Sequence, residues 1–220
     1  MFFPLQKNQI KKLVGLNKNN ETLIEELKIE GITENNILCA IKKVPREIFV
    51  RRQFIQQAHE NIPLPIDCNQ TISQPLVVAF MIHYLDLKKN DRVLEIGTGT
   101  GYQTAILASL CKYVYTVEMF QELLSQAKIN HNKLKLKNIN YMLGNGANGW
   151  NKPVLFDAII ISASAEKISS KLLKNLKDKG NLIFPKKYSF ENQALLLLKK
   201  VNAYKYTSQR LFDVKFVPLL

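Results

Sequence analysis

The stretch VLEIGTGTGYQT, from Val93 to Thr104, decides how the rest of the chain is interpreted. It begins with a short apolar run, continues through Gly97, Gly99 and Gly101, and ends in residues that favour a helix. This strand–loop–helix context makes the glycines informative. Glycine has no Cβ, so the backbone can approach a ligand closely, and the free N–H groups at the helix start are directed toward that ligand.

The spacing of these glycines limits which ligand fits. They follow the pattern G-x-G-x-G, whereas the dinucleotide fingerprint G-x-G-x-x-G places the third glycine one residue later. The loop therefore predicts a ligand site but fits NAD imperfectly.

Outward from this loop, short apolar runs alternate with helical patterns. Strands are predicted at 92–97, 113–118, 139–144, 156–162 and 180–185, and helices at 75–85, 102–111, 120–135 and 166–177. Such alternation indicates a parallel sheet covered on both faces. The tail differs, because 193–201 and 206–220 are two strand-like runs with no helix between them, and they should pair antiparallel. The expected fold class is α/β, a doubly wound, mostly parallel Rossmann-like sheet with an antiparallel C-terminal strand pair.

The residues before this pattern are organised differently. Helices are predicted over 20–31, ending at Gly31, and over 33–45, with Thr33 as the capping residue. Residues 46–75 are rich in proline and polar residues, and we expect them to be mostly irregular. Irregular segments of this length inside compact domains are usually functional.

Two further loops join the glycine loop at one edge of the predicted sheet. Glu118 ends the second strand, where a carboxylate can accept both hydroxyls of a ribose. The loop GNGANGW, from Gly144 to Trp150, follows the third strand. All three loops follow the carboxyl ends of parallel strands, where such sheets bind ligands. We therefore predict a ligand site there.

Composition restricts the class of protein. No apolar run reaches the roughly 18 residues needed to span a bilayer, and the first residues lack the pattern of a secretory signal. Cys39, Cys68 and Cys111 form no metal-binding spacing and indicate reduced thiols in a cytoplasm. The net charge of +13 comes almost entirely from dispersed lysines. Nucleic-acid readers cluster their cations and favour arginine, so we interpret the charge as a solvated surface and expect no specific nucleic-acid or membrane partner.

The segment NQTISQP, from Asn69 to Pro75, is open to two interpretations. Ser73 can cap the helix that begins near Pro75, or it can serve a site. Thr71 and Ser73 occupy alternate positions of an extended run and can point the same way. The residues alone do not choose between a cap and a function.

A family resemblance favours function. The glycine loop, the acidic residue after the second strand and the antiparallel tail resemble a class I S-adenosylmethionine-dependent methyltransferase. The segments QTISQP, VLEIGTGTGYQTAILA, FDAIII, FDVKFVPL and VPREIFV resemble protein-L-isoaspartate O-methyltransferases, from about Ile37 to the C-terminus. The resemblance implies methyl transfer from S-adenosylmethionine to the free carboxylate of L-isoaspartyl residues, which begins the repair of damaged proteins.

The same resemblance implies the site residues. It implies Ser73 as the catalytic residue, with Thr71, Ile72 and Gln74 on the substrate side. It implies a cofactor-binding set of Glu95, Gly97, Thr98, Gly99, Gly101, Glu118, Asn145 and Gly146, and no metal. Residues 1–74 would form helices and an acceptor-side loop packed on a methyltransferase domain of residues 75–220. A cytoplasmic monomer acting on isoaspartyl peptides and proteins is expected.

The sequence departs from the family pattern mainly on the acceptor side. The family has Gly-His-Gly where Asp67, Cys68 and Asn69 stand, and Asn145 replaces an aspartate. The other departures are Ser162-Ala163-Ser164 after the fourth strand and Pro185-Lys186-Lys187 after the fifth. If the loop alignment holds, Asp67 would add negative charge near the docking carboxylate.

The implied chemistry needs no general base, because a carboxylate with a pKa of about 4 is already ionised at neutral pH. The sequence identifies no partner for His59, His83 or His131. Two other functions remain open. One is a methyltransferase for RNA or a small molecule; SASAEK after the fourth strand lacks the N/D-P-P-Y/F motif of base methyltransferases and argues against nucleobases. The other is a non-catalytic module that binds the cofactor or nucleic acid.

Overall fold

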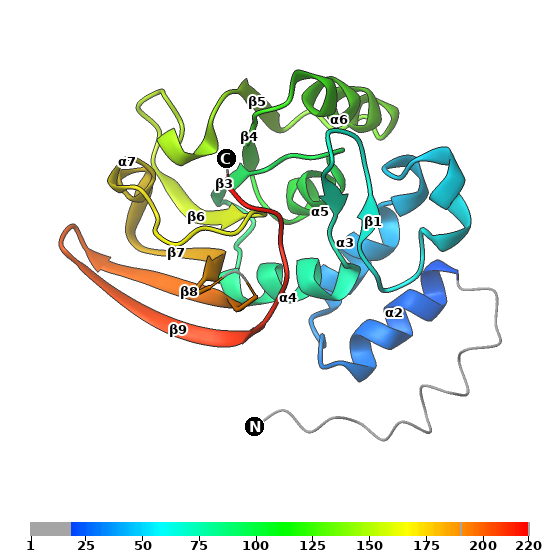
Figure 1. The fold of residues 1–220 in the computed structure, drawn as a ribbon, viewed down its shortest axis with the longest axis horizontal. Helices are drawn as coiled ribbons and strands as arrows, with labels where there is room; N and C mark the ends of the chain where they lie inside the picture. The colour runs from blue at the N-terminus through cyan, green and yellow to red at the C-terminus, as the bar shows by residue number, and fades with distance from the viewer. Residues whose placement is uncertain (1–18, 190, 220) are drawn as a thin grey trace.

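A computed structural model describes residues 19–189 and 191–219 of the 220-residue chain (Figure 1). A seven-stranded sheet forms its centre. The strands are β3 (Arg92–Ile96), β4 (Tyr113–Glu118), β5 (Ile139–Leu143), β6 (Phe156–Ile161), β7 (Leu176–Lys187), β8 (Gln193–Asn202) and β9 (Lys205–Asp213). A second sheet is a two-stranded hairpin of β1 (Leu64–Pro65) and β2 (Thr71–Ile72).

The strand order of the main sheet is β5-β4-β3-β6-β7-β8-β9. Pairing is parallel from β5 to β7, and β7–β8 and β8–β9 pair antiparallel. This confirms the predicted fold, including the antiparallel C-terminal pair. The chain order reverses at β3, which lies between β4 and β6, and sheets of this kind bind ligands at such a switch point.

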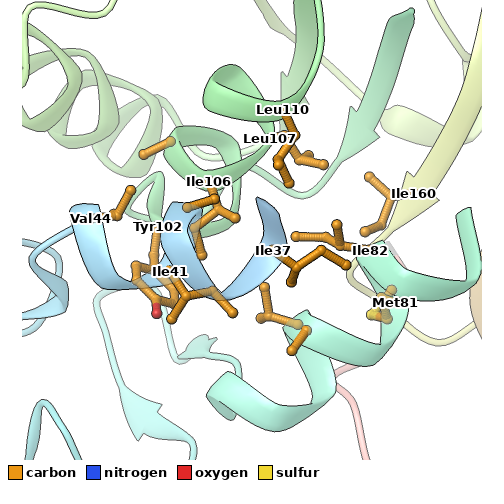
Figure 2. Packing of buried hydrophobic residues seen from close by; sticks show 14 of the residues in the cluster. Ile37, Ile41, Val44, Met81, Ile82, Tyr102, Ile106, Leu107, Leu110 and Ile160 are labelled. Carbon is orange, nitrogen blue, oxygen red and sulfur yellow. The ribbon is translucent and has the colours of Figure 1, made fainter. Parts of the chain in front are cut away.

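The helices are α2 (Asn20–Ile29), α3 (Asn35–Lys43), α4 (Pro75–Leu85), α5 (Tyr102–Leu110), α6 (Gln121–Lys133) and α7 (Ser170–Lys174). The 3₁₀ turns are η1 (Arg46–Ile48), η2 (Arg52–Gln57) and η3 (Gly146–Asn148). Side chains of α3, α4 and α5 pack together and meet Ile160 of β6 (Figure 2).

Alternate residues of the buried strands supply two cores, because successive strand side chains point to opposite faces. Val93 and Ile160 join the core beneath α2–α5. Their neighbours Leu94 and Ile159 join a second core on the other face, with Leu172 of α7. Both faces of the sheet are therefore covered, as the continuous apolar runs predict.

Three local predictions need correction. The helix expected over 166–177 is limited to α7, because Leu176 pairs with Phe156 as the start of β7. The N-cap of α3 is Glu34 rather than Thr33, and its carboxylate instead binds the Thr33 N–H and the ring of His83. The segment 46–75 is not wholly irregular, since it contains η1, η2 and the β1–β2 hairpin.

Candidate active site

A pocket lies at the switch point of the sheet and encloses about 850 Å³ of empty space, including its open mouth. Its walls come from the loops after β3, β4 and β6, from the β2 segment and from the C-terminal tail. The predicted site residues that line it are Thr71, Ile72, Ser73, Gly97, Thr98, Gly99, Gly101, Glu118 and Gly146. Glu95, Gln74 and Asn145 do not belong to its lining.

Two of the lining glycines are required by close packing. Gly101 has φ +97°, and a Cβ there would collide with the imidazole of His131. A Cβ on Gly146 would collide with the side chain of Ile96 at the end of β3. Larger residues at these positions would displace the loops, so the glycines determine the shape of the pocket floor.

Glu118 ends β4 at the pocket and holds two loops. Its Oε2 accepts the N–H of Gly99 at 2.8 Å, and its Oε1 accepts those of Met119 at 2.8 Å and Phe120 at 3.1 Å. The carboxylate is buried, and the glycine loop is thereby fixed relative to β4. Glu118 thus lines the pocket at the end of β4, and its contact with a ribose stays a prediction.

Glu95 lies behind the pocket wall and is completely buried. It accepts hydrogen bonds from Thr104 at 2.5 Å, from Thr116 at 2.7 Å and from Gln103 at 3.0 Å. Burial raises the pKa of Glu95 to about 7, although these hydrogen bonds act in the opposite direction. One of these donors, Gln103, lines the pocket and also donates to Ser162 at 2.9 Å.

Asn145 shapes its own turn. Its side-chain oxygen caps η3 by accepting the N–H of Ala147 at 2.8 Å, and the residue is exposed. Asn145 itself does not line the pocket, whereas its neighbour Gly146 does.

Ser73 lies in the pocket wall between β2 and α4 and does not cap the helix. The N-cap of α4 is Gln74, whose side chain makes no capping bond, and Pro75 is the first helical residue. Asn61 provides the cap instead, because its side-chain oxygen accepts the N–H of Leu76 at 3.0 Å. The capping interpretation of Ser73 is therefore wrong, and its hydroxyl is not used at the helix start.

The Ser73 segment is held from behind by Arg46, whose side chain is almost fully buried. One guanidinium nitrogen donates to the carbonyls of Ala58 and Glu60, and the other donates to those of Ile62 at 2.9 Å and Ser73 at 3.1 Å. Burial lowers the pKa of Arg46 to about 10, so the group stays charged at neutral pH.

The Arg46 guanidinium also reaches the glycine side of the site. It lies 5.6 Å from the ring centroid of Tyr102, the first residue of α5. Ser73 and Tyr102 both line the pocket, and the buried guanidinium of Arg46 contacts both residues.

Sequence reasoning missed the C-terminal tail, in which Val217, Pro218 and Leu219 line the pocket. Ser164 binds the tail through its N–H to Val217 at 2.7 Å and through its carbonyl to the N–H of Leu219 at 2.8 Å. No local pattern in the tail predicts this position. Gln103 was also missed, and Ser162 was noted after the fourth strand without being assigned to the site, although the strand-end rule could have placed it there.

Asp67 lies outside the pocket lining. Arg51 binds its carboxylate from Nε at 3.0 Å and from Nη2 at 2.7 Å, and both side chains are exposed. The ion pair offsets the negative charge of Asp67, which we expected near the docking carboxylate. The hairpin tip itself is tight, because Cys68 and Asn69 both have positive φ.

Among the described residues that line the pocket, the titratable side chains are Glu118 and Tyr102. Burial raises the pKa of Tyr102 to about 12, so its hydroxyl keeps its proton. The three histidines do have partners, which are Glu47 for His59, Glu34 for His83, and Gly101 with Tyr141 for His131. None of the three lines the pocket.

The described part of the chain has neither a cluster of metal-ligating side chains nor a membrane-spanning helix. No group of three or more His, Cys, Asp or Glu side chains there could hold a metal ion. No helix within residues 19–189 and 191–219 is long and apolar enough to cross a membrane.

Known proteins resemble this chain over most of its length. The family model described as protein-L-isoaspartate(D-aspartate) O-methyltransferase matches residues 17–220. A protein-L-isoaspartate O-methyltransferase of Dictyoglomus turgidum is 45% identical over 199 residues, covering 90% of each chain. One from Vibrio vulnificus is 41% identical over 204 residues, covering 93% of this chain and 97% of the relative.

A solved structure has the same fold. It is a Plasmodium falciparum protein described as a protein-L-isoaspartate O-methyltransferase, in complex with S-adenosyl-L-homocysteine. It superimposes with a TM-score of 0.81 at 27% identity, covering 92% of this chain and 98% of the other.

Proposed function

The chain belongs to the protein-L-isoaspartate O-methyltransferase family, and from this premise we propose that it methylates the free carboxylate of L-isoaspartyl residues in damaged proteins, with S-adenosylmethionine as donor. The observation that carries the proposal is a single pocket in which the glycine loop and Glu118 face the Ser73 segment. A cofactor site and an acceptor segment thus share one cavity.

The residues present fit this cofactor. Thr100 lines the pocket, and its buried hydroxyl has no hydrogen-bond partner among the described residues. Buried polar groups are normally paired, so this hydroxyl points to a polar ligand. Val117, Met119 and Phe120 add apolar surface suited to an adenine ring, and Glu118 offers carboxylate oxygens to ribose hydroxyls.

We assign the cofactor contacts accordingly. Gly97, Thr98, Gly99 and Gly101 would hold the methionine end, Glu118 the ribose, and Gly146 the adenine side. Glu95 and Asn145 would act indirectly, because Glu95 holds Gln103 and Asn145 caps the turn that presents Gly146. S-adenosylmethionine, when bound, supplies a sulfonium-activated methyl group.

The chain's remaining task is to present the acceptor. An isoaspartyl carboxylate is ionised at neutral pH, so the lining needs no base, in keeping with its few titratable groups. Attack by an anion on a cation disperses charge in the transition state, so a pocket that excludes water favours it. Ser73, with Thr71, Ile72 and Gln74 nearby, would hold the carboxylate in line through its hydroxyl.

The larger organisation follows from these assignments. Residues 1–74 would form the acceptor-side cover and residues 75–220 the cofactor-binding domain, with residues 1–18 outside the described part. In support, α2 and α3 share one core with α4 and α5. We further propose that the protein acts as a monomer in the cytoplasm and uses no specific nucleic acid.

The decisive experiment measures methyl incorporation from S-adenosylmethionine into an isoaspartyl peptide and its aspartyl twin. The twins differ only in which carboxyl group joins the backbone. We expect methylation of the isoaspartyl peptide and none of the aspartyl one. Equal methylation of both, or methylation of RNA alone, would overturn the proposal, and cofactor binding without any methyl transfer would indicate a non-catalytic module.

A further inference from the structure

Two neighbouring residues of α6 hold the glycine loop from behind. Asn130 donates from Nδ2 to the Thr100 carbonyl at 3.0 Å, and His131 Nε2 lies 2.7 Å from the Gly101 carbonyl. Both side chains are completely buried. They do not line the pocket, so any action on a ligand passes through the loop.

The hydrogen bonds determine which nitrogen of the His131 ring carries the proton in its neutral form. A carbonyl oxygen only accepts, so Nε2 carries the proton and donates to Gly101. In the neutral ring Nδ1 accepts, and the Tyr141 hydroxyl of β5 lies 2.8 Å from it. Burial lowers the pKa of His131, which favours this neutral form. The ring of Phe49 packs beside the imidazole, with 6.2 Å between the two ring centroids. A Cβ on Gly101 would collide with the imidazole of His131.

The two carbonyls that α6 holds belong to Thr100 and Gly101, and both residues line the pocket. Thr100 is the residue whose buried hydroxyl lacks a partner among the described residues, and Asn130 determines how its backbone is turned. Gly101 precedes the first turn of α5, and its orientation determines where the free N–H groups of that helix are directed. With both carbonyls held by α6, the loop lines the pocket on its other side.

We propose that Asn130 and His131, with Tyr141 behind them, are positioning residues for S-adenosylmethionine: they hold the loop Gly97–Gly101 in its binding shape. The inference rests on the proposed function and deepens it. The loop has the required shape before the ligand arrives, which lowers the cost of ordering it on binding.

The test compares three variants with a matched control. His131→Leu removes the ring nitrogens at similar volume, and His131→Gln restores a donor near Nε2. Tyr141→Phe removes only the hydroxyl that holds Nδ1. Asn138→Leu is the control, because Asn138 donates to carbonyls at the other end of α5, including that of Ala108 at 2.8 Å.

The readouts are the Kd for S-adenosylmethionine by calorimetry, the melting temperature, and the peptide KM at saturating donor. Without the hydrogen bond from His131 to Gly101, binding has to order the loop, and an ordering cost of about 1.5 kcal/mol corresponds to a roughly 10-fold rise in Kd. We expect that increase for His131→Leu, recovery to within about 3-fold of wild type for His131→Gln, and an intermediate value for Tyr141→Phe. The peptide KM should stay unchanged in all three, and Asn138→Leu should lower only the melting temperature.

Different failures have different meanings. A His131→Leu variant that melts lower, like the control, but binds S-adenosylmethionine as tightly as wild type would overturn the inference and leave the proposed function intact. If His131→Leu does not fold, an unchanged Kd in Tyr141→Phe would overturn the inference equally, because that variant removes the hydroxyl that holds Nδ1. A wild-type chain that fails to bind S-adenosylmethionine would overturn the proposed function and this inference together.

Discussion

At the scale of single residues, Ser73 offers the sharpest separation of catalysis from stability. It lines the pocket and does not cap α4. One hydrogen bond to a charged carboxylate is worth about 1.5–3 kcal/mol, so Ser73→Ala should lower kcat/KM for an isoaspartyl peptide roughly 10- to 100-fold. The Kd for S-adenosylmethionine and the melting temperature should stay near wild type.

A true cap serves as the control for this variant. Asn19 caps α2 by accepting the N–H of Thr22 at 2.9 Å. Asn19→Ala should cost about 1 kcal/mol of stability and leave turnover unchanged. If Ser73→Ala resembled Asn19→Ala in both measurements, Ser73 would be structural.

Glu118 is the residue assigned to the ribose. Glu118→Ala should weaken S-adenosylmethionine binding by about 1–3 kcal/mol, because charge-assisted hydrogen bonds are lost and the Gly99 N–H is freed. The exposed Glu122, on the first turn of α6, provides a charge-matched control. Calorimetry measures both, and equal affinity in Glu118→Ala and Glu122→Ala would contradict the assignment.

Glu95 predicts a pH dependence of stability. Burial raises its pKa from the ordinary value of 4.5 to about 7 in the folded chain, so the folded state holds the proton more tightly. This contribution is fully present below the unfolded pKa and is lost as pH rises through the folded pKa. The melting temperature of wild type, relative to Glu95→Gln, should therefore fall as the pH rises from about 4.5 to about 7. Parallel melting curves across that range would mean that Glu95 does not titrate there.

At the scale of elements, the β1–β2 hairpin and the segment before it depend on Arg46. Its guanidinium donates to four carbonyls, including that of Ser73, and a lysine cannot span them with one nitrogen. Arg46→Lys should cost about 2–4 kcal/mol of stability and raise the peptide KM several-fold. The Kd for S-adenosylmethionine should change little. A normal peptide KM in a folded Arg46→Lys chain would show that the acceptor segment holds its own shape.

The elements also differ in how well local pattern predicts them. The strands β3 to β6 are continuous apolar runs between helical patterns, and all were predicted close to their observed bounds. The helix predicted over 166–177 failed, because Leu172 and Leu176 have helical spacing but occupy different elements. Asn175 follows the last residue of α7, and its side chain accepts the N–H of Trp150 and donates to the Trp150 carbonyl. Local periodicity does not predict such a long-range contact.

At the scale of the whole molecule, the net charge of +13 raises the question of nucleic acid. Because the cations are mostly dispersed lysines, we expect duplex and single-stranded nucleic acids to bind weakly and without sequence preference. Such binding should disappear between about 50 mM and 200 mM salt, since it depends on counterion release. A salt titration by fluorescence anisotropy checks this, and tight binding at physiological salt would favour an RNA acceptor.

The sequence by itself determined the sheet, its antiparallel end, the glycine loop and Glu118. These features depend on local periodicity and on the rule that ligands bind at the carboxyl ends of parallel strands. A short stretch of sequence is therefore enough to predict each of them. It also singled out the Ser73 segment, although without deciding between cap and site.

Only the tertiary structure decided the rest. It provided Asn61 as the cap of α4, which leaves the Ser73 hydroxyl unused at the helix start. It brought the tail to the pocket at Ser164 and placed His131 behind Gly101. These pairs are separated by 15 to 53 residues in the chain. Hydrogen bonds and close packing between such distant segments depend on the folded positions of both partners, and no local pattern encodes those positions.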